Sequence, residues 1–277
     1  MQYRILGKTG LKVSAVGFGG IPIQRIDARG TRALMERLVE KGVNYIDTAR
    51  GYTVSESYLG EALSGGLREK FILATKSMSR GYADMARDIG ISLSNLRTDY
   101  IDLYQLHNIK SDADFELAFS AEGAVAAIQD AIRAGKVGHL GATAHSVDSF
   151  ERLLSYPEIE TIMFPYNIVE SQGEALMERA AAQNVGVIAM KPLAGGNITD
   201  GTLAMRYILQ NKTCTLAIPG MATLEEIEQN TAAAEQDGPL TPEELAACEA
   251  IRAGLSGNFC RRCGYCAPCT VGIDIPG

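Results

Sequence analysis

Eight short apolar runs, each followed by a segment with helical spacing, constrain the fold of this 277-residue chain more than any other feature. Continuous apolar runs are typical of parallel strands that are buried on both faces. Regular alternation of strand and helix predicts either a (β/α)8 barrel or an open doubly wound sheet. The runs are residues 16–18, 45–46, 71–74, 101–106, 139–142, 161–164, 185–190 and 213–218.

The helical segments and the chain length favour the barrel. A barrel of this class takes about 250 residues. An open dinucleotide-binding sheet would show a Gly-x-Gly-x-x-Gly turn after a strand, but Gly17-Phe18-Gly19-Gly20 continues into Ile21-Pro22. We therefore predict an α/β fold of the (β/α)8 TIM-barrel type. The expected helices are residues 31–40, 56–63, 83–96, 123–134, 147–154, 173–183, 202–210 and 224–234.

Both ends of the chain carry additional elements. Residues 3–6 and 12–14 flank a Gly-Lys-Thr-Gly turn, which predicts an N-terminal β-hairpin that closes the barrel floor. Near the other end, Thr241 reads as a helix N-cap followed by proline and two acids, with Gly254 as the stop. We expect a barrel over residues 1–240 and an extension over residues 241–277, made of a helix and a Cys-rich tail.

The charge and hydropathy exclude some partners. A formal net charge of −7 and a pI near 5.1 leave no basic surface for nucleic acid. No stretch approaches the roughly 20 apolar residues of a membrane helix, and the first residues lack a secretory signal. The expectation is a cytoplasmic protein with no membrane partner.

Four residues with proton-transfer chemistry follow successive predicted strands: Asp47, Tyr52, Lys76 and His107. Side chains at the carboxyl ends of barrel strands converge on one rim, where active sites are built. Reduction of a carbonyl by hydride requires a proton donor, and an ammonium beside a phenol would lower its pKa from about 10. Taken singly, the same residues could be a structural ion pair, a loop aromatic and a structural histidine.

Three blocks around these residues resemble the catalytic blocks of the aldo-keto reductases: NYIDTARGY (44–52), FILATK (71–76) and IDLYQLH (101–107). The opening RILGKTGLKVSAVGFGG resembles the hairpin and first strand of that family, and the resemblance covers residues 3–235. It implies an oxidoreductase that transfers hydride between a nicotinamide cofactor and a small-molecule aldehyde or ketone, or an alcohol. In the implied mechanism Tyr52 is the general acid and base, Lys76 tunes it, Asp47 orients Lys76, and His107 orients the carbonyl.

The resemblance also implies a cofactor site on the later strands. VIAMKPLAGG (187–196) resembles the loop along the pyrophosphate, and AIPGMATLEEIEQN (217–230) resembles the adenosine loop, whose helix start would offer amides to phosphate. The implied contacts are Gly20, Thr143, Met163, Met190, Lys191, Pro192, Leu193, Gly195, Pro219, Gly220, Thr223, Glu226, Gln229 and Asn230.

Some of these positions depart from the family pattern. Thr143-Ala144 replaces the usual Ser-Asn, and Met163 and Met190 replace a glutamine and a tyrosine that hold the nicotinamide. These departures motivate an alternative, a redox-sensing or electron-transfer protein on the same barrel with little or no reductase turnover.

The choice between NADH and NADPH is indicated by residues 220–226, which contain two acids and no cation. Carboxylates repel a 2′-phosphate and can bond a 2′-hydroxyl, which favours NADH. A cation from Lys191 or from an arginine elsewhere would instead allow NADPH.

Four of the six cysteines lie in the tail at equal x2 spacings, at Cys260, Cys263, Cys266 and Cys269. A compact loop of this kind is typical of a [4Fe–4S] cluster, with zinc, or free or disulfide-linked thiols, as alternatives. A redox-active cluster would imply an electron-transfer partner. Cys214 and Cys248 are expected in the core.

Overall fold

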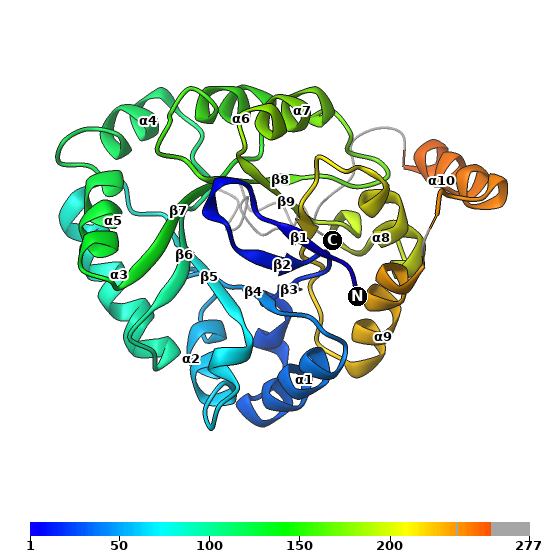
Figure 1. The fold of residues 1–277 in the computed structure, drawn as a ribbon, viewed down its shortest axis with the longest axis horizontal. Helices are drawn as coiled ribbons and strands as arrows, with labels where there is room; N and C mark the ends of the chain where they lie inside the picture. Colours follow the sequence, from blue (N-terminus) through cyan, green and yellow to red (C-terminus); the bar gives the residue numbers. More distant parts are fainter. Residues whose placement is uncertain (237, 256–277) are drawn as a thin grey trace, which may run out of the picture.

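The computed structural model describes residues 1–236 and 238–255, and its centre is a closed parallel sheet (Figure 1). The strands are hydrogen-bonded in chain order from β3 to β10, and bridges from Val16 to Ala217 and from Gly19 to Gly220 join the two edges. Closure confirms the barrel and excludes the open sheet. The strands are β3 (Phe18–Gly19), β4 (Tyr45–Asp47), β5 (Ile72–Ser77), β6 (Ile101–Leu106), β7 (Val137–Thr143), β8 (Thr161–Pro165), β9 (Gly186–Met190) and β10 (Leu216–Ala217).

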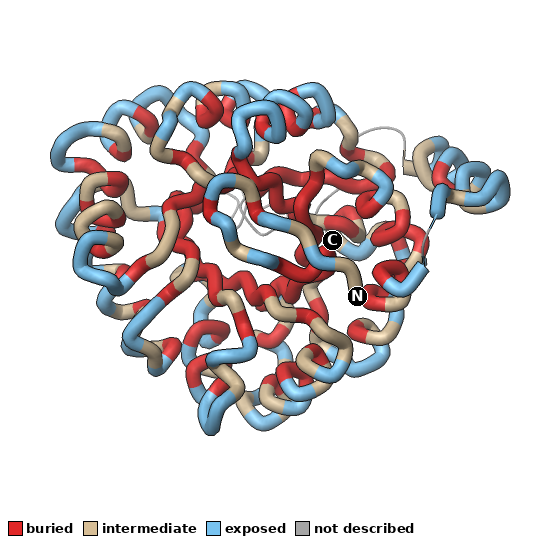
Figure 2. Tube along the Cα trace, viewed as in Figure 1, coloured by how far each residue is buried: buried red, intermediate tan, exposed pale blue. Residues whose placement is uncertain are grey.

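Helices surround the barrel, and their buried faces form the main core against the outer face of the sheet. Figure 2 shows the strands almost entirely buried and the helices exposed on their outward sides. Eight helices lie within a few residues of their predicted positions: α1 (Ala28–Glu40), α2 (Ser55–Ala62), α3 (Tyr82–Leu96), α5 (Ala124–Arg133), α6 (Val147–Leu153), α7 (Glu174–Ala182), α8 (Gly201–Gln210) and α9 (Leu224–Ala232). Short 3-10 turns are η1 (Gly7–Thr9), η2 (Pro22–Arg25), η3 (Arg68–Lys70), η4 (Ala194–Gly196) and η5 (Ala233–Glu235).

One helix, α4 (Asp112–Ala118), lies outside the eight helical segments predicted from the sequence. Ser111 and Asp114 form a capping box, in which each side chain bonds the backbone N–H of the other residue. The motif was present in the sequence, but the helix is too short for its apolar spacing to be recognised. The helix buries Phe115 and Ala118.

The predicted hairpin closes the amino-terminal end of the barrel. β1 (Tyr3–Ile5) pairs antiparallel with β2 (Lys12–Ser14), and the pair lies across the barrel opening in Figure 1. Leu6 and Val13 are fully buried in the same cluster as the inward-facing residues of the barrel. Gly7 has a φ of +51°, and a Cβ there would lie 2.2 Å from the backbone nitrogen of Gly186, so only glycine fits.

The predicted C-terminal helix is α10 (Pro242–Gly254), which begins with a Thr241–Glu244 capping box. It runs alongside α8: Glu244 pairs with Arg206, and Cys248 is buried beside residues of α8. At the other end, Arg252 donates Nε–H to the carbonyl of Ile168 at 2.8 Å. The end of α10 therefore lies beside the loops after β8 and β9.

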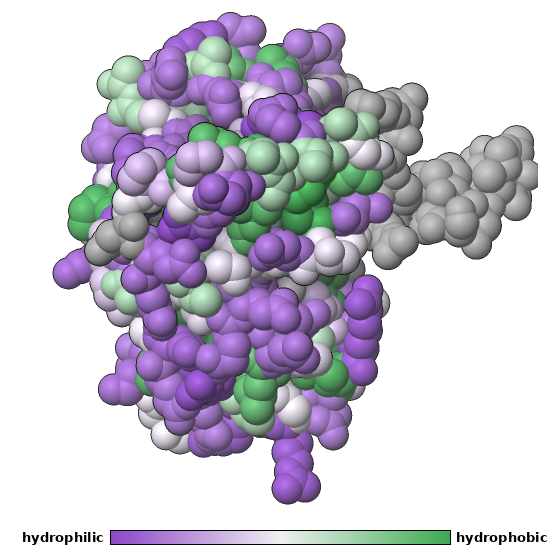
Figure 3. All heavy atoms as spheres, turned by 90° about the vertical axis from the view of Figure 1, so that its right-hand side faces the viewer, coloured by the Kyte–Doolittle hydropathy of each residue, from purple (hydrophilic) through white to green (hydrophobic). Residues whose placement is uncertain are grey.

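The side of the molecule that carries α8 and α10 is mostly hydrophilic, with a smaller group of hydrophobic residues (Figure 3). Within the described part of the chain, no helix combines the length and apolar character needed to span a bilayer. Cys214 is also buried, as predicted for both isolated cysteines. The four clustered cysteines lie outside the described residues.

Candidate active site

The carboxyl ends of β4 and β5 bring Asp47 and Lys76 into a buried ion pair. Lys76 Nζ donates to Asp47 Oδ2 and also to the carbonyl oxygen of Thr48, at 2.9 Å. The other oxygen of Asp47 accepts the amide of Gln105, Nε2 to Oδ1, at 3.0 Å. Burial raises the pKa of Asp47, while Lys76 and Gln105 oppose that rise. These hydrogen bonds therefore fix the orientation of the Asp47 carboxylate and of the Lys76 ammonium.

Tyr52 lies on the loop after β4 and covers this pair. Lys76 Nζ lies 4.9 Å from the centroid of the Tyr52 ring, which is a cation–π contact. The ring of His107, directly after β6, meets Tyr52 edge to face with centroids 5.9 Å apart and planes at 88°. The structure thus brings together the four side chains predicted from the sequence.

The pKa of Tyr52 is raised above its ordinary value, first by burial and then by the charge of Asp47. The expectation that Lys76 lowers this pKa is therefore wrong for this structure. The physical reason is that burial disfavours the phenolate, and the negative charge of Asp47, which is paired with Lys76, acts on the phenol in the same direction. Tyr52 consequently holds its proton at neutral pH.

The imidazole of His107 is neutral. Burial lowers its pKa to about 2, and the positive charges of Lys76, His145 and Arg80 act in the same direction. Its backbone N–H donates to the carbonyl of Ser77 at 2.9 Å, which fixes the start of the loop. A neutral imidazole with an N–H can donate one hydrogen bond to an oxygen in the site.

Gln105 was missed by the sequence analysis, although it lies within the block IDLYQLH. It is fully buried and pairs in register with Lys76 across β5 and β6. The signal was its position two residues before His107, because residues two apart in a strand share a face. Glu56 and Arg80 were also missed, since their partners are distant in sequence.

Residues of the first and last strands join the two halves of the rim. The N–H of Gly20 donates to the carbonyl of Asp47 at 2.8 Å, and that of Gly19 donates to Pro219 at 2.8 Å. A Cβ at Gly220 would lie 2.7 Å from Cγ of Pro22. The loops after β3 and β10 therefore pack closely.

The residues expected to contact the nicotinamide differ in their burial and hydrogen bonding. Thr143, at the end of β7, accepts the N–H of Asn108 on Oγ1 at 2.7 Å, and its hydroxyl can still donate. Met163 is buried in the interior cluster with 1% exposure, and Met190 lies at the end of β9 with 9% exposure.

The loop after β9 has an irregular backbone. Lys191 has a φ of +55° and Gly195 a φ of +71°, with Pro192 and Leu193 between them. The carbonyl of Lys191 accepts Nδ2–H of the buried Asn167 at 3.0 Å, so this loop is attached to the loop after β8.

The first backbone N–H groups of α9 are capped by side chains of the same segment. Thr223 and Glu226 form a capping box, and the Glu226 carboxylate accepts the N–H groups of Ala222 at 2.6 Å and Thr223 at 3.1 Å. Two amides of the segment expected to bind phosphate are therefore already bonded to a carboxylate. The Thr-x-x-Glu pattern in the sequence was the signal for this cap.

Deeper on α9, Asn230 is 2% exposed, and no donor reaches its Oδ1 among the described residues. A buried acceptor of this kind can accept an N–H from a bound molecule, and the amino group of adenine is one such donor. Its neighbour Gln229 is exposed and bonds Glu225 at 3.4 Å. The residues present fit the adenine end of a nicotinamide cofactor.

No group of three or more metal-ligating side chains occurs in residues 1–236 and 238–255.

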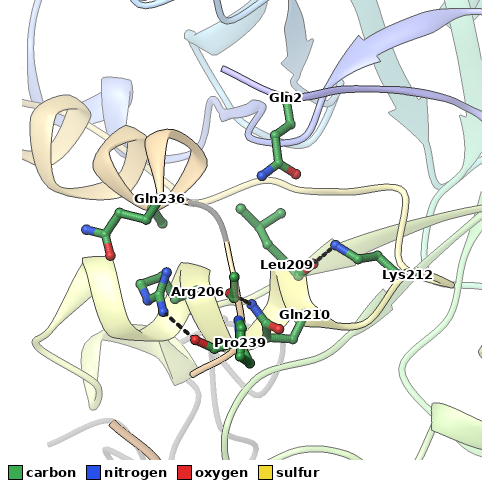
Figure 4. A pocket seen from close by; sticks show the side chains of 9 residues that line it. Gln2, Arg206, Leu209, Gln210, Lys212, Gln236 and Pro239 are labelled. Atoms are coloured by element: carbon green, nitrogen blue, oxygen red, sulfur yellow. Dashed lines mark hydrogen bonds between the residues drawn. The ribbon is translucent and has the colours of Figure 1, made fainter. Parts of the chain in front are cut away.

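A separate cavity of about 280 Å³ lies near the opposite end of the barrel, between Gln2 and the last turns of α8 (Figure 4). Arg206 lines it but is paired with Glu244 and bonded to the carbonyl of Pro239. That charge is therefore already neutralised.

The fold and the site define a class of enzyme, and the sequence model of the Aldo/keto reductase family matches residues 15–202. The chain belongs to this family and is an oxidoreductase. It is 28% identical to L-galactose dehydrogenase of Arabidopsis thaliana, over 91% of this chain and 94% of that protein. It is 26% identical to the aldo-keto reductase YhdN of Bacillus subtilis, over 76% and 67%. The holo form of aldo-keto reductase AKR11C1 from Bacillus halodurans superposes with a TM-score of 0.79 at 26% identity, covering 91% of this chain and 96% of that one.

Proposed function

We propose that the chain catalyses the nicotinamide-dependent reduction of an aldehyde or ketone, and the reverse oxidation of an alcohol. The observation that carries the proposal is the cluster of Lys76, Tyr52 and His107, with 4.9 Å from the ammonium to the phenol ring and 5.9 Å between the two rings. It lies at the carboxyl ends of β4 to β6, the end of a barrel where catalytic residues converge.

Tyr52 supplies the proton in this proposal. A bound nicotinamide would supply hydride to the carbonyl carbon, and the phenol Oη–H of Tyr52 then protonates the carbonyl oxygen. The raised pKa keeps Tyr52 protonated, which is the form that reduction needs. Lys76 offers its charge to the phenolate left behind, while Asp47, itself held by the amide of Gln105, keeps the ammonium beside the ring.

His107 orients the substrate. Because its imidazole is neutral, it donates one N–H to the carbonyl oxygen and does not compete with Tyr52 as the acid. The ring stands at 88° to the Tyr52 ring, so both side chains can address one oxygen from different directions.

The nucleotide would be held by the loops after β7 to β10, with the adenine at Asn230 and the pyrophosphate along residues 191–195. The carboxylate of Glu226 at the start of α9 supports NADH over NADPH, because it repels a 2′-phosphate and can accept a ribose 2′-hydroxyl. Titration with each reduced cofactor tests this. Tighter binding of NADPH would overturn it.

The alternative, a redox sensor or electron-transfer protein with little turnover, is less favoured because the relatives are oxidoreductases. The deciding experiment is Tyr52→Phe, with the exposed Tyr100→Phe as the matched control. We expect Tyr52→Phe to lower carbonyl reduction by about 10²-fold or more without weakening NADH binding. Unchanged reduction by Tyr52→Phe would favour the sensor. The substrate panel should include sugars, since one relative is named for L-galactose.

We also propose that Cys260, Cys263, Cys266 and Cys269 bind a [4Fe–4S] cluster, which would give the enzyme an electron-transfer partner. The support is their x2 spacing in one short segment. Visible absorption with iron, sulfide and zinc analysis of anaerobically purified protein tests it. Zinc without iron, or no metal, would overturn the cluster.

A further inference from the structure

Arg80 joins two loops of the rim. It follows β5, and its side chain is 11% exposed. One terminal nitrogen donates to the carbonyls of His107 at 2.8 Å and Asn108 at 3.1 Å, and the other donates to the carbonyl of Met78 at 3.0 Å. A single guanidinium therefore connects the loop after Lys76 with the loop that carries His107.

The His107–Asn108 segment turns sharply after β6 and is held by hydrogen bonds on both sides. Asn108 has a φ of +52°, in the left-handed region that asparagine adopts more readily than most residues other than glycine. The N–H of His107 donates to the carbonyl of Ser77, and the N–H of Asn108 donates to Thr143 Oγ1 at 2.7 Å. On the carbonyl side both oxygens are bonded by Arg80.

The charge of Arg80 is balanced outside the site. Its Nε lies 3.4 Å from Asp114 Oδ1, and Asp114 belongs to the capping box that begins α4. The guanidinium thus reaches from α4 to the rim, with its terminal N–H groups directed to the two loops. The charged and titratable groups that act on His107 are Lys76 on β5, His145 after β7 and Arg80 itself.

We propose that Arg80 is a positioning residue, which holds the His107–Asn108 backbone so that the imidazole keeps its place beside Tyr52. This inference rests on the proposed function. Arg80 does not touch the reacting atoms, and it acts only through the carbonyl oxygens of the His107 loop. A shift of that loop by about 1 Å would move the hydrogen-bond donor away from the substrate oxygen, and such a shift can cost about 10²-fold in rate.

The test compares Arg80→Met and Arg80→Lys with the wild type, and uses Arg87→Met as the matched control. Arg87 lies on α3, with 63% of its side chain exposed and a partner within its own helix. Hydrogen exchange is measured at the amides of Asn108 and Ile109, both bonded to Thr143, and at the reference amide of Gly20. Turnover and NADH affinity are measured on the same samples.

In Arg80→Met we expect exchange at Asn108 and Ile109 to accelerate by at least about tenfold, with Gly20 unchanged. We expect kcat to fall by about 10- to 100-fold while the NADH dissociation constant stays within about twofold. Arg80→Lys keeps the charge but cannot span both loops, so its kcat should stay close to that of Arg80→Met. Arg87→Met should match the wild type in every measurement.

Three results would overturn the inference: wild-type exchange in Arg80→Met, faster exchange with an unchanged kcat, or full recovery of kcat in Arg80→Lys. The last result would show that charge matters and bridging does not. If the wild type reduced no carbonyl at all, the proposed function would fail separately, and exchange at Asn108 would still decide whether Arg80 holds the loop.

Discussion

Glu56 should be one of the most important single residues for the stability of this barrel. It is 1% exposed on α2, and its carboxylate accepts four hydrogen bonds from different parts of the chain. Oε1 accepts Thr75 Oγ1 at 2.9 Å and Ser92 Oγ at 2.7 Å, and Oε2 accepts Arg50 Nη1 at 2.9 Å and Asn95 Nδ2 at 3.2 Å. These bonds connect α2 with β5, α3 and the loop that carries Tyr52.

Replacing Glu56 with alanine would leave all four donors without this acceptor. Breaking a buried ion pair by removing one partner costs about 3–5 kcal/mol. Arg50 keeps a weaker contact with Asp88, 3.8 Å away, so we take about 4 kcal/mol as the central value. For a chain of this size, about 2–4 °C per kcal/mol gives a fall in Tm of roughly 8–16 °C.

The assay is thermal unfolding followed by circular dichroism, with Glu61→Ala as the control. Glu61 lies on the same helix, has 58% of its side chain exposed and contacts Arg97 at 3.5 Å. Exposed pairs of this kind contribute about 0–1 kcal/mol, so the control should unfold within about 2 °C of the wild type. A loss below about 1 kcal/mol in Glu56→Ala would refute the reasoning, because it would mean that the network forms no net interaction.

Three further predictions concern pH, packing and cofactor choice. The pKa of His107 is near 2 in the folded protein, so below about pH 6.5 only the unfolded chain takes up this proton. Between pH 7 and pH 5, the free energy of unfolding should therefore fall by about 2 kcal/mol more in the wild type than in His107→Gln, as measured by urea unfolding. Gly60→Ala places a Cβ 2.1 Å from the backbone oxygen of Asn95 and should lower stability by about 1–3 kcal/mol in the same assay, whereas Gly90→Ala, with no atom within 4 Å, should not destabilise. Glu226→Gln removes the negative charge at the start of α9, and NADPH should bind at least about threefold more tightly in a fluorescence titration; no change would count against the role given to this carboxylate.

The apolar runs predicted the strands of the barrel well, because a strand buried on both faces must be apolar along its length. Closure was inferred only from length and strand count, since the contacts that produce it join Gly19 to Gly220, two hundred residues apart. The short helix α4 was missed because its seven residues give too little periodicity.

The positions of the four clustered residues followed from strand ends, but their electrostatics did not. The pairing of Asp47 with Lys76 was predicted from the sequence, whereas the burial that raises the pKa of Tyr52 was not. Most hydrogen bonds of Arg80 and Glu56 could not be predicted either, because they reach backbone and side chains 19 to 39 residues away that no local pattern connects.

The hairpin covers the amino-terminal end of the barrel with apolar side chains. Leu6 and Val13 pack in one cluster with residues of the barrel interior, and a Cβ at Gly7 would collide with the backbone of Gly186 at the start of β9. In the proposed function, substrate and nucleotide would therefore reach the catalytic cluster from the carboxyl-terminal end of the barrel. A variant that loosened the hairpin would admit water to the apolar interior beneath Asp47 and Lys76, and would weaken the ion pair from below.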